Sequence, residues 1–134
     1  MGKKSRRGPT VLAELAALVL AAAAAALPPA GSFTVYAYCT ERYPHICGGS
    51  AYTYSGEPVQ AGHTVAVDPA VIPLGSWLYI EGLGWRQAAD TGSAIDGRRL
   101  DLAVCTHEEA LTWGVQHRQV WIWEGDTCLQ RPTN

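Results

Sequence analysis

The chain has 134 residues and a formal net charge of −2, with ten basic and twelve acidic residues. Without its first 30 residues it keeps six basic and eleven acidic residues, a net charge of −5 over about 104 residues. This length suffices for one small domain with a modest core, and the negative charge argues against nucleic acid or an anionic membrane surface as a partner.

The N-terminal segment has the pattern of a secretory signal peptide. Four basic residues precede an Ala/Leu-rich stretch over residues 11–27, and small residues follow it. Glu14 interrupts the apolar stretch, and an uncleaved N-terminal anchor is the alternative. We expect residues 1–30 to be a signal peptide, residues 31–128 to form the folded domain and residues 129–134 to be a flexible tail.

Short apolar or alternating runs, separated by Gly, Pro and Asp, predict β-structure after the leader. Thr106 is expected to N-cap one short helix that carries Glu108 and Glu109 in its first turn and ends at Gly114. Seven short strands without βαβ alternation predict a small all-β barrel or sandwich. The expected strands are Phe33–Cys39, Ala51–Tyr54, Thr64–Val67, Trp77–Glu81, Trp85–Ala89, Leu100–Val104 and Gln119–Trp123.

All four cysteines lie after the leader, and an even number in a small exported chain indicates disulfides, for which three pairings exist. We predict Cys39–Cys47, which closes a short loop, and Cys105–Cys128, which ties the tail to the domain. Zinc is the alternative, but no C-x-x-C or H-x-x-x-H spacing is present, so disulfides are favoured. The histidines available to zinc are His45, His107 and His117.

Three aspartates stand at the edges of apolar runs: Asp68 in TVAVDPAVIPLGS, Asp90 in RQAADTGSAIDG and Asp101 in RRLDLAV. Two carboxylates in a partly dry cleft push their pKa values apart, which provides a proton donor and an ionised partner. Acid–base chemistry on a glycosidic bond needs this combination. Each aspartate taken alone is also compatible with an ordinary turn or cap.

Asp101 is the hardest of the three to explain as a turn residue, because it lies in the middle of an apolar strand. Strand alternation places it on the same face as Arg99 and Ala103, with Leu100 and Leu102 on the face that fills the core. The alternative is a structural aspartate paired with a neighbouring arginine.

Three segments, VAVDPAVIPLGSWLYIEGLG, AADTGSAIDGRRLDLAV and HEEALTWG, resemble in this order the bacterial 3D (three-aspartate) domain. Through it the chain resembles the core of MltA-type lytic transglycosylases of peptidoglycan. The resemblance runs from Thr34 to Trp123 and implies a six-stranded double-psi β-barrel with one short helix. Asp96 departs from the pattern, since it stands where a basic or polar residue is expected and adds a fourth carboxylate.

The resemblance also implies roles for particular residues. Asp101 would be the catalytic acid–base group, with Asp90 and Asp68 positioning the sugar ring or holding up the pKa of Asp101. The candidates for substrate binding are Thr91, Gly92, Tyr54, Trp77 and Arg99. Exposed aromatic rings stack on sugars, although most of the twelve aromatic residues are expected in packing roles.

The function implied is that of an exported lytic transglycosylase, monomeric and located at the cell wall. It would cleave the MurNAc-β-1,4-GlcNAc bond of peptidoglycan strands and leave 1,6-anhydro ends. No metal, cofactor or nucleic acid is expected, nor any membrane contact after leader removal. The main alternative is a non-catalytic module that binds cell-wall glycan in the same cleft. Hydrolysis by an inverting carboxylate pair is a third possibility, which depends on the separation of the carboxyl groups.

Overall fold

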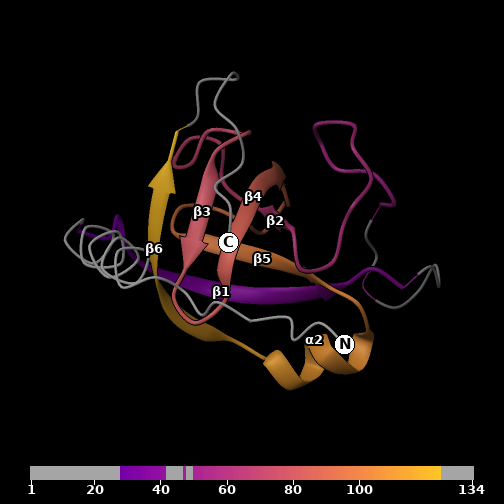
Figure 1. The fold of residues 1–134 in the computed structure, drawn as a ribbon. Helices are drawn as coiled ribbons and strands as arrows, with labels where there is room; N and C mark the ends of the chain where they lie inside the picture. The colour runs from indigo at the N-terminus through magenta and orange to yellow at the C-terminus, as the bar shows by residue number, and fades with distance from the viewer. Residues whose placement is uncertain (1–27, 42–46, 48–49, 125–134) are drawn as a thin grey trace, which may run out of the picture.

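The computed structural model describes residues 28–41, 47 and 50–124, which form a closed barrel of six strands with one helix (Figure 1). Around the barrel the strands follow the order β1-β5-β2-β4-β3-β6. The expected all-β barrel with one short helix is therefore confirmed. The elements are β1 (Gly31–Cys39), β2 (Thr64–Ala66), β3 (Trp77–Ile80), β4 (Gly84–Asp90), β5 (Arg99–Val104), α2 (His107–Trp113) and β6 (Gln116–Trp123).

The strand order combines parallel and antiparallel pairs. β1 runs parallel to β5 and antiparallel to β6, whereas β2 runs parallel to β4 and antiparallel to β5. Parallel neighbours need crossover connections, because no short turn can join them. β2 lies between β4 and β5, so its last residue, Ala66, is in register with both of these strands.

Strand alternation sorts the side chains between the core and the outer surface. Leu100 and Leu102 of β5 are buried, as predicted. In β6, Val120 is buried and Ile122 packs against the core, whereas Trp121 and Trp123 lie on the other face. The core cluster consists of Phe33, Val35, Val65, Val67, Ile72, Leu78, Ile80, Ala88, Leu100, Leu102 and Val120.

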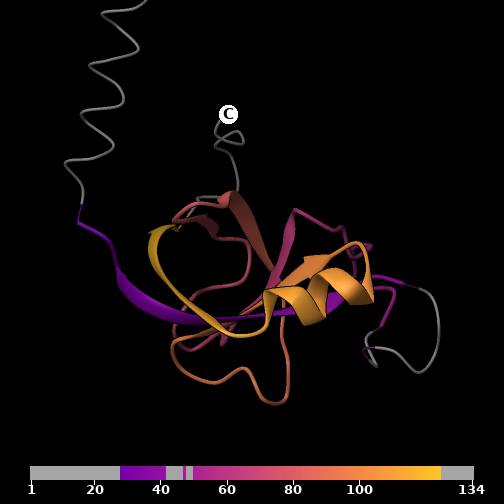
Figure 2. The same ribbon diagram turned by 90° about the horizontal axis from the view of Figure 1, so that it is seen from below.

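The single helix begins and ends where the sequence predicts. The Thr106 side chain accepts a hydrogen bond from the Glu109 backbone N–H, and the Glu109 carboxylate accepts one from the Thr106 N–H, which completes a capping box. Gly114 forms the C-cap with a φ of 62°. Trp113 Nε1 donates to the Val35 carbonyl at 2.9 Å and ties the helix to β1, beside which it lies in Figure 2.

The predicted strand Ala51–Tyr54 is wrong. This segment forms a turn-rich loop whose one ladder contact is an isolated bridge between Tyr52 and Pro58. Side-chain hydrogen bonds compete here with strand pairing, since the Thr53 hydroxyl accepts from the Glu57 N–H at 3.2 Å. The Ser55 hydroxyl donates to the carbonyl of Ala89 at 3.0 Å, so the loop is held against the C-terminal end of β4.

The cysteines differ from the expected pattern. Cys39, Cys47 and Cys105 are free thiols, so the predicted Cys39–Cys47 disulfide is not formed. The Cys47 sulfur instead accepts the Cys39 backbone N–H at 3.2 Å and lies 3.4 Å from Nδ1 of His107. Cys105 is free as well, so the predicted Cys105–Cys128 disulfide is not formed; Cys128 itself falls outside the described residues.

The predicted leader, except for its last three residues, and the predicted tail also lie outside the described residues, so the domain limits stay predictions. Within the part of the chain that the structure describes, no helix has the length and apolar character needed to cross a bilayer.

Candidate active site

Asp101 lies in the middle of β5 with its carboxyl group turned away from the core. Its neighbours in register are Tyr36 on β1 and Ala66 on β2. The oxygen Oδ1 is buried and has no hydrogen-bond partner. Burial, and next the negative charge of Asp90, raise the pKa of Asp101 to about 6. The group can therefore hold a proton in mildly acidic solution, as a general acid must.

Asp90 ends β4, directly after an irregularity in the ladder with β2. The register shifts between Val65 and Ala66, so that Ala66 pairs with Asp90 rather than with Ala89. A bulge of this kind changes the face of the sheet to which the next side chain, here that of Asp90, points. Ala66 thus has Asp90 on one neighbouring strand and Asp101 on the other. The bulge explains how two carboxylates meet on one face of the barrel wall.

Three donors surround the carboxylate of Asp90. The backbone N–H groups of Tyr54 and Thr91 donate to Oδ1 at 3.0 and 2.9 Å. The Tyr38 hydroxyl donates to Oδ2 at 3.5 Å. Both oxygens of Asp90 are therefore engaged, in contrast to the unpartnered Oδ1 of Asp101. The two carboxylates therefore differ: Asp90 is held in place by its hydrogen bonds, whereas Asp101 has one oxygen without a partner.

Tyr38 is a site residue that the sequence analysis missed. Burial, then the charges of Asp90 and Asp101, and then the hydrogen bond to Asp90 raise the pKa of its hydroxyl. The phenol therefore stays protonated and acts as a donor between two carboxylates. Alternation along β1 was the available signal, since Phe33, Val35 and Cys39 are buried and Tyr38 lies on the opposite face. Its partner in register on β5, Ala103, is small and leaves room for the ring.

Asp68 is held separately from this pair. Its Oδ1 accepts the N–H of Ala70 at 2.9 Å, and its Oδ2 accepts the N–H of Gly97 at 2.7 Å. The Gly97 bond, and then the Ala70 bond, lower the pKa of Asp68. The carboxylate thus braces the turn after β2 against the loop that leads into β5. The alternative of a turn residue, which the sequence left open for each aspartate, agrees with these contacts, and a part of Asp68 in the reaction stays a prediction.

A family match covers the part of the chain that contains Asp68, Asp90 and Asp101. Residues 63–124 match the model of the 3D domain family. The predicted resemblance is confirmed, and β1, which supplies Tyr38, lies outside the matched residues of the 3D domain.

Two curated relatives come from Bacillus subtilis (strain 168). The chain is 54% identical to "Cell wall-binding protein YocH" over 52 residues, which are 39% of this chain and 18% of that protein. It is 42% identical to "Putative cell wall shaping protein YabE" over 76 residues, 54% of this chain and 19% of that protein. The chain therefore matches less than a fifth of the length of either relative.

Similar solved structures include two lytic transglycosylases. MltA of Escherichia coli with bound chitohexaose is 22% identical, with a TM-score of 0.48 over 57% of this chain and 28% of that one. LtgG of Burkholderia pseudomallei is also 22% identical, with a TM-score of 0.43 over 55% of this chain and 27% of that one.

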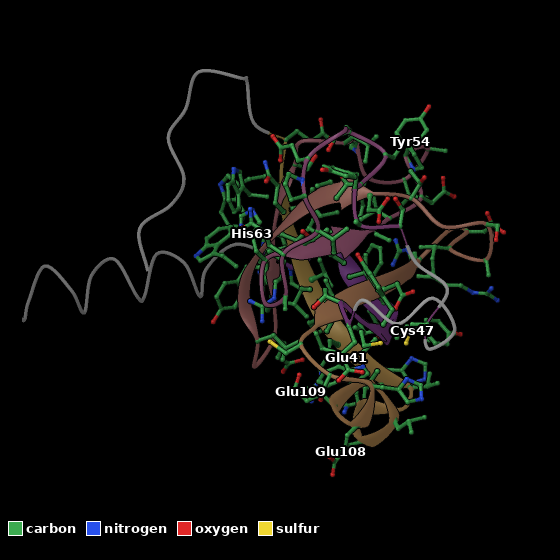
Figure 3. All side chains as sticks on the ribbon, turned by 90° about the vertical axis from the view of Figure 1, so that its right-hand side faces the viewer. Glu41, Cys47, Tyr54, His63, Glu108 and Glu109 are labelled. Carbon is green, nitrogen blue, oxygen red and sulfur yellow. The ribbon has the colours of Figure 1, made fainter. Side chains whose placement is uncertain are left out.

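Three of the five predicted substrate-binding residues, Tyr54, Thr91 and Gly92, lie close to Asp90. Thr91 follows it directly, and Tyr54 donates its N–H to the carboxylate while its side chain is 73% exposed. Figure 3 shows Tyr54 pointing outward at the end of the barrel remote from α2. Gly92 packs within the loop, since a Cβ there would lie 2.8 Å from Cγ1 of Ile95. Its role is therefore to let Ile95 approach, whereas the sequence suggested approach of a sugar or a neighbouring chain.

The other two predicted substrate-binding residues have different surroundings. The Arg99 guanidinium donates to the carbonyl of Ala94 at 3.2 Å rather than to Asp101, so the predicted alternative of an Arg99–Asp101 pair is not seen. Trp77 pairs in register with Gln87 and Trp123 and meets the ring of His63 edge-on at 5.6 Å. Trp77 thus belongs to the outer face of β3, β4 and β6.

A cavity of about 790 Å³ lies between α2 and the barrel. Gly62, Arg86, Leu102 and Trp113 are among its lining residues, and none of the three aspartates is. The Arg86 guanidinium donates hydrogen bonds to the carbonyls of Leu83 and Trp85, both at 2.8 Å, and burial lowers its pKa. The cavity is therefore separate from the aspartate site.

Proposed function

We propose that this protein acts on bacterial cell-wall peptidoglycan and cleaves its glycan strands as a lytic transglycosylase. The observation that carries the proposal is the half-buried carboxyl group of Asp101, which has one buried oxygen without a partner and a pKa raised to about 6 by burial and by Asp90. A protonated carboxyl of this kind is what cleavage of a glycosidic bond requires. The names of the two relatives, one cell wall-binding and one cell wall shaping, support the choice of polymer.

The reaction uses Asp101 twice. Its proton passes to the oxygen of the MurNAc-β-1,4-GlcNAc bond as the bond to C1 breaks. The carboxylate that results then takes the proton of the C6 hydroxyl while that oxygen bonds to C1, which gives a 1,6-anhydro end and restores the acid. One acid–base group suffices, so no protein nucleophile and no activated water is needed.

Asp90 favours this route over hydrolysis by an inverting pair. An inverting enzyme needs its second carboxylate free to activate a water. Both oxygens of Asp90 already accept hydrogen bonds from Tyr54, Thr91 and Tyr38. Asp90 is therefore better suited to raising the pKa of Asp101 and stabilising the positive charge that develops on the sugar ring.

The substrate strand would lie over the face that carries the loop before β2. Tyr52 and Tyr54 are 61% and 73% exposed, and the loop is fastened to the end of β4 by Ser55. Exposed tyrosine rings beside the carboxylates suit stacking on sugar rings. The protein would act outside the cytoplasm as a monomer on the wall.

The second candidate function is binding of wall glycan without cleavage. The observation that favours it is the name of the relative that is 54% identical, which is described as cell wall-binding. The same exposed tyrosines would serve such a module. The two functions differ in whether Asp101 is needed for more than affinity.

The deciding experiment incubates the purified protein with peptidoglycan sacculi and analyses the soluble products by mass spectrometry. The proposal expects 1,6-anhydro muropeptides, lighter than hydrolytic products by one water, and their loss by about 10²–10⁴-fold in Asp101→Asn. Asp96→Asn is the matched control, since Asp96 is exposed. Sacculus binding without product release from about pH 5 to 7 would support the binding module instead, and products that carry the extra water would indicate hydrolysis.

A further inference from the structure

Three potential metal ligands meet where β1 ends and α2 begins. They are Cys39, Cys47 and His107, and their ligand atoms all lie within 4.8 Å of one another. Cys39 is the last residue of β1, and His107 is the first residue of α2. Figure 3 shows Cys47 close to the helix. The cluster is separate from the aspartate site, because none of its members contacts Asp90 or Asp101 through a described hydrogen bond.

The spacing of the ligand atoms suits a tetrahedral zinc ion. Zinc bonds to sulfur at about 2.3 Å and to nitrogen at about 2.0–2.1 Å, so neighbouring ligand atoms of a tetrahedral site are about 3.5–3.8 Å apart. Cys47 Sγ lies 3.4 Å from His107 Nδ1, and Cys39 Sγ lies within 4.8 Å of both. A cation at the centre of the group needs only small movements of the side chains.

The framework holds two of the three ligands in place without a metal. Cys39 pairs with Val104 across the β1–β5 ladder, and the next N–H, that of Thr40, donates to the Val104 carbonyl at 2.9 Å. His107 follows three residues after Val104, and the capping box on Thr106 fixes the first turn of its helix. Ligands that are positioned before the ion arrives lower the cost of binding it.

A backbone hydrogen bond points at the Cys47 sulfur. The Cys39 N–H donates to Cys47 Sγ at 3.2 Å. Donors of this kind stabilise thiolates, the form of cysteine that binds metals, and orient them as outer-shell groups do in zinc sites. Two thiolates also neutralise the charge of Zn²⁺, which suits a site where Cys39 is buried and the other two ligands are half-buried.

The histidine distinguishes a metal site from a disulfide. A bridge between the two cysteines would involve only the sulfur atoms and gives no reason for an imidazole nitrogen at 3.4 Å from one of them. The sequence did not reveal the site because its ligands come from a strand end, a loop and a helix start rather than from a C-x-x-C pair.

We propose that Cys39, Cys47 and His107 bind one Zn²⁺, which fastens the end of β1 to the start of α2. Binding releases the two thiol protons to solvent, and the fourth coordination position is open to water. The ion would be structural for the barrel, and the proposal does not depend on the enzymatic function.

The test uses the exported protein, reduced under a non-chelating reductant, freed of metal and titrated with ZnCl₂. We expect one zinc per chain by elemental analysis, a higher melting temperature, and thiolate-to-metal charge-transfer absorption when Co²⁺ replaces zinc. Cys47→Ser and His107→Gln should each weaken zinc binding by more than about 100-fold. The control is the double variant Cys105→Ser/Cys128→Ser, which keeps the three ligands and should bind as the parent does.

Three results would overturn the proposal. The first is a reduced parent protein, folded by circular dichroism, that binds no stoichiometric zinc. The second is zinc binding that survives Cys47→Ser and His107→Gln but is lost in the double control variant. The third is isolation of the exported protein with Cys39 and Cys47 in one disulfide-linked fragment, two hydrogens lighter than the thiol form.

Discussion

Replacement of Asp101 by asparagine should stabilise the protein at neutral pH, although it removes the proposed catalytic group. Burial, and next the charge of Asp90, raise the pKa of Asp101 from 3.8 to about 6. Between these two pH values the folded state binds the proton more tightly than the unfolded chain does, so stability falls as pH rises through the window. Above about pH 6 the full penalty is present, and below about pH 4 it is absent.

The size of this penalty follows from the difference between the two pKa values. At full strength it is about 3 kcal/mol, because each pH unit corresponds to about 1.4 kcal/mol. Asp101 is only partly buried, and solvent screening reduces the expected value to about 1–2 kcal/mol. Asparagine has the same shape and cannot ionise, so Asp101→Asn should gain this amount at about pH 7 and nearly nothing at about pH 4.

The assay is urea unfolding of the parent protein and the variant at about pH 4, 5, 6 and 7. Asp96→Asn is the control, because Asp96 is exposed and its replacement should change stability little at any of these values. If the stability difference between Asp101→Asn and the parent does not grow as pH rises, the carboxyl of Asp101 has an ordinary pKa. Asp101 would then be ionised in mildly acidic solution and could not serve as the proposed proton donor.

Four further outcomes are expected. Release of muropeptides by the parent should fall about tenfold per pH unit above about pH 6, because the acid form of Asp101 is then depleted; a flat rate from pH 5 to 8 would contradict this. Asp68→Asn should lower the melting temperature at neutral pH, and this loss should shrink as the pH falls through the lowered pKa of the parent carboxyl. Gly92→Ala should cost about 1–3 kcal/mol in urea unfolding, since its Cβ would lie 2.8 Å from Ile95, whereas an unchanged midpoint would show that the loop yields freely. Tyr38→Phe should cost about 0.5–1.5 kcal/mol through loss of one long hydrogen bond, and a stability equal to the parent's would show that this bond contributes nothing.

The sequence predicted the elements whose signals are local. The capping box of Thr106 and Glu109 and the positive φ at Gly114 depend on neighbouring residues, and the helix was predicted to the residue. The alternation in β5 also predicted which face of this strand is buried. The strand prediction for Ala51–Tyr54 failed because side-chain hydrogen bonds of Thr53 and Ser55 override the alternating pattern. Such bonds are not visible in a pattern of apolar and polar residues.

The site was predicted only in part, because its geometry depends on pairs of strands. The resemblance to 3D domains indicated three aspartates, and strand alternation turned Asp101 outward. The register shift that brings Asp90 to the same face is a property of the β2–β4 ladder, and no local pattern predicts it. Tyr38 was missed for the same reason: it lies 52 residues before Asp90 in the chain and reaches it only because β1 pairs with β5.

The position of β1 has a practical consequence for anyone who expresses part of this chain. β1 closes the barrel through ladders with both β5 and β6, and it supplies Phe33 and Val35 to the core. A fragment limited to residues 63–124, the residues of the family match, would leave β5 and β6 with unpaired hydrogen-bonding edges. It would also leave a gap in the apolar core. The smallest autonomous folding unit is therefore longer than the family match, and a fragment meant to fold by itself should start before Gly31.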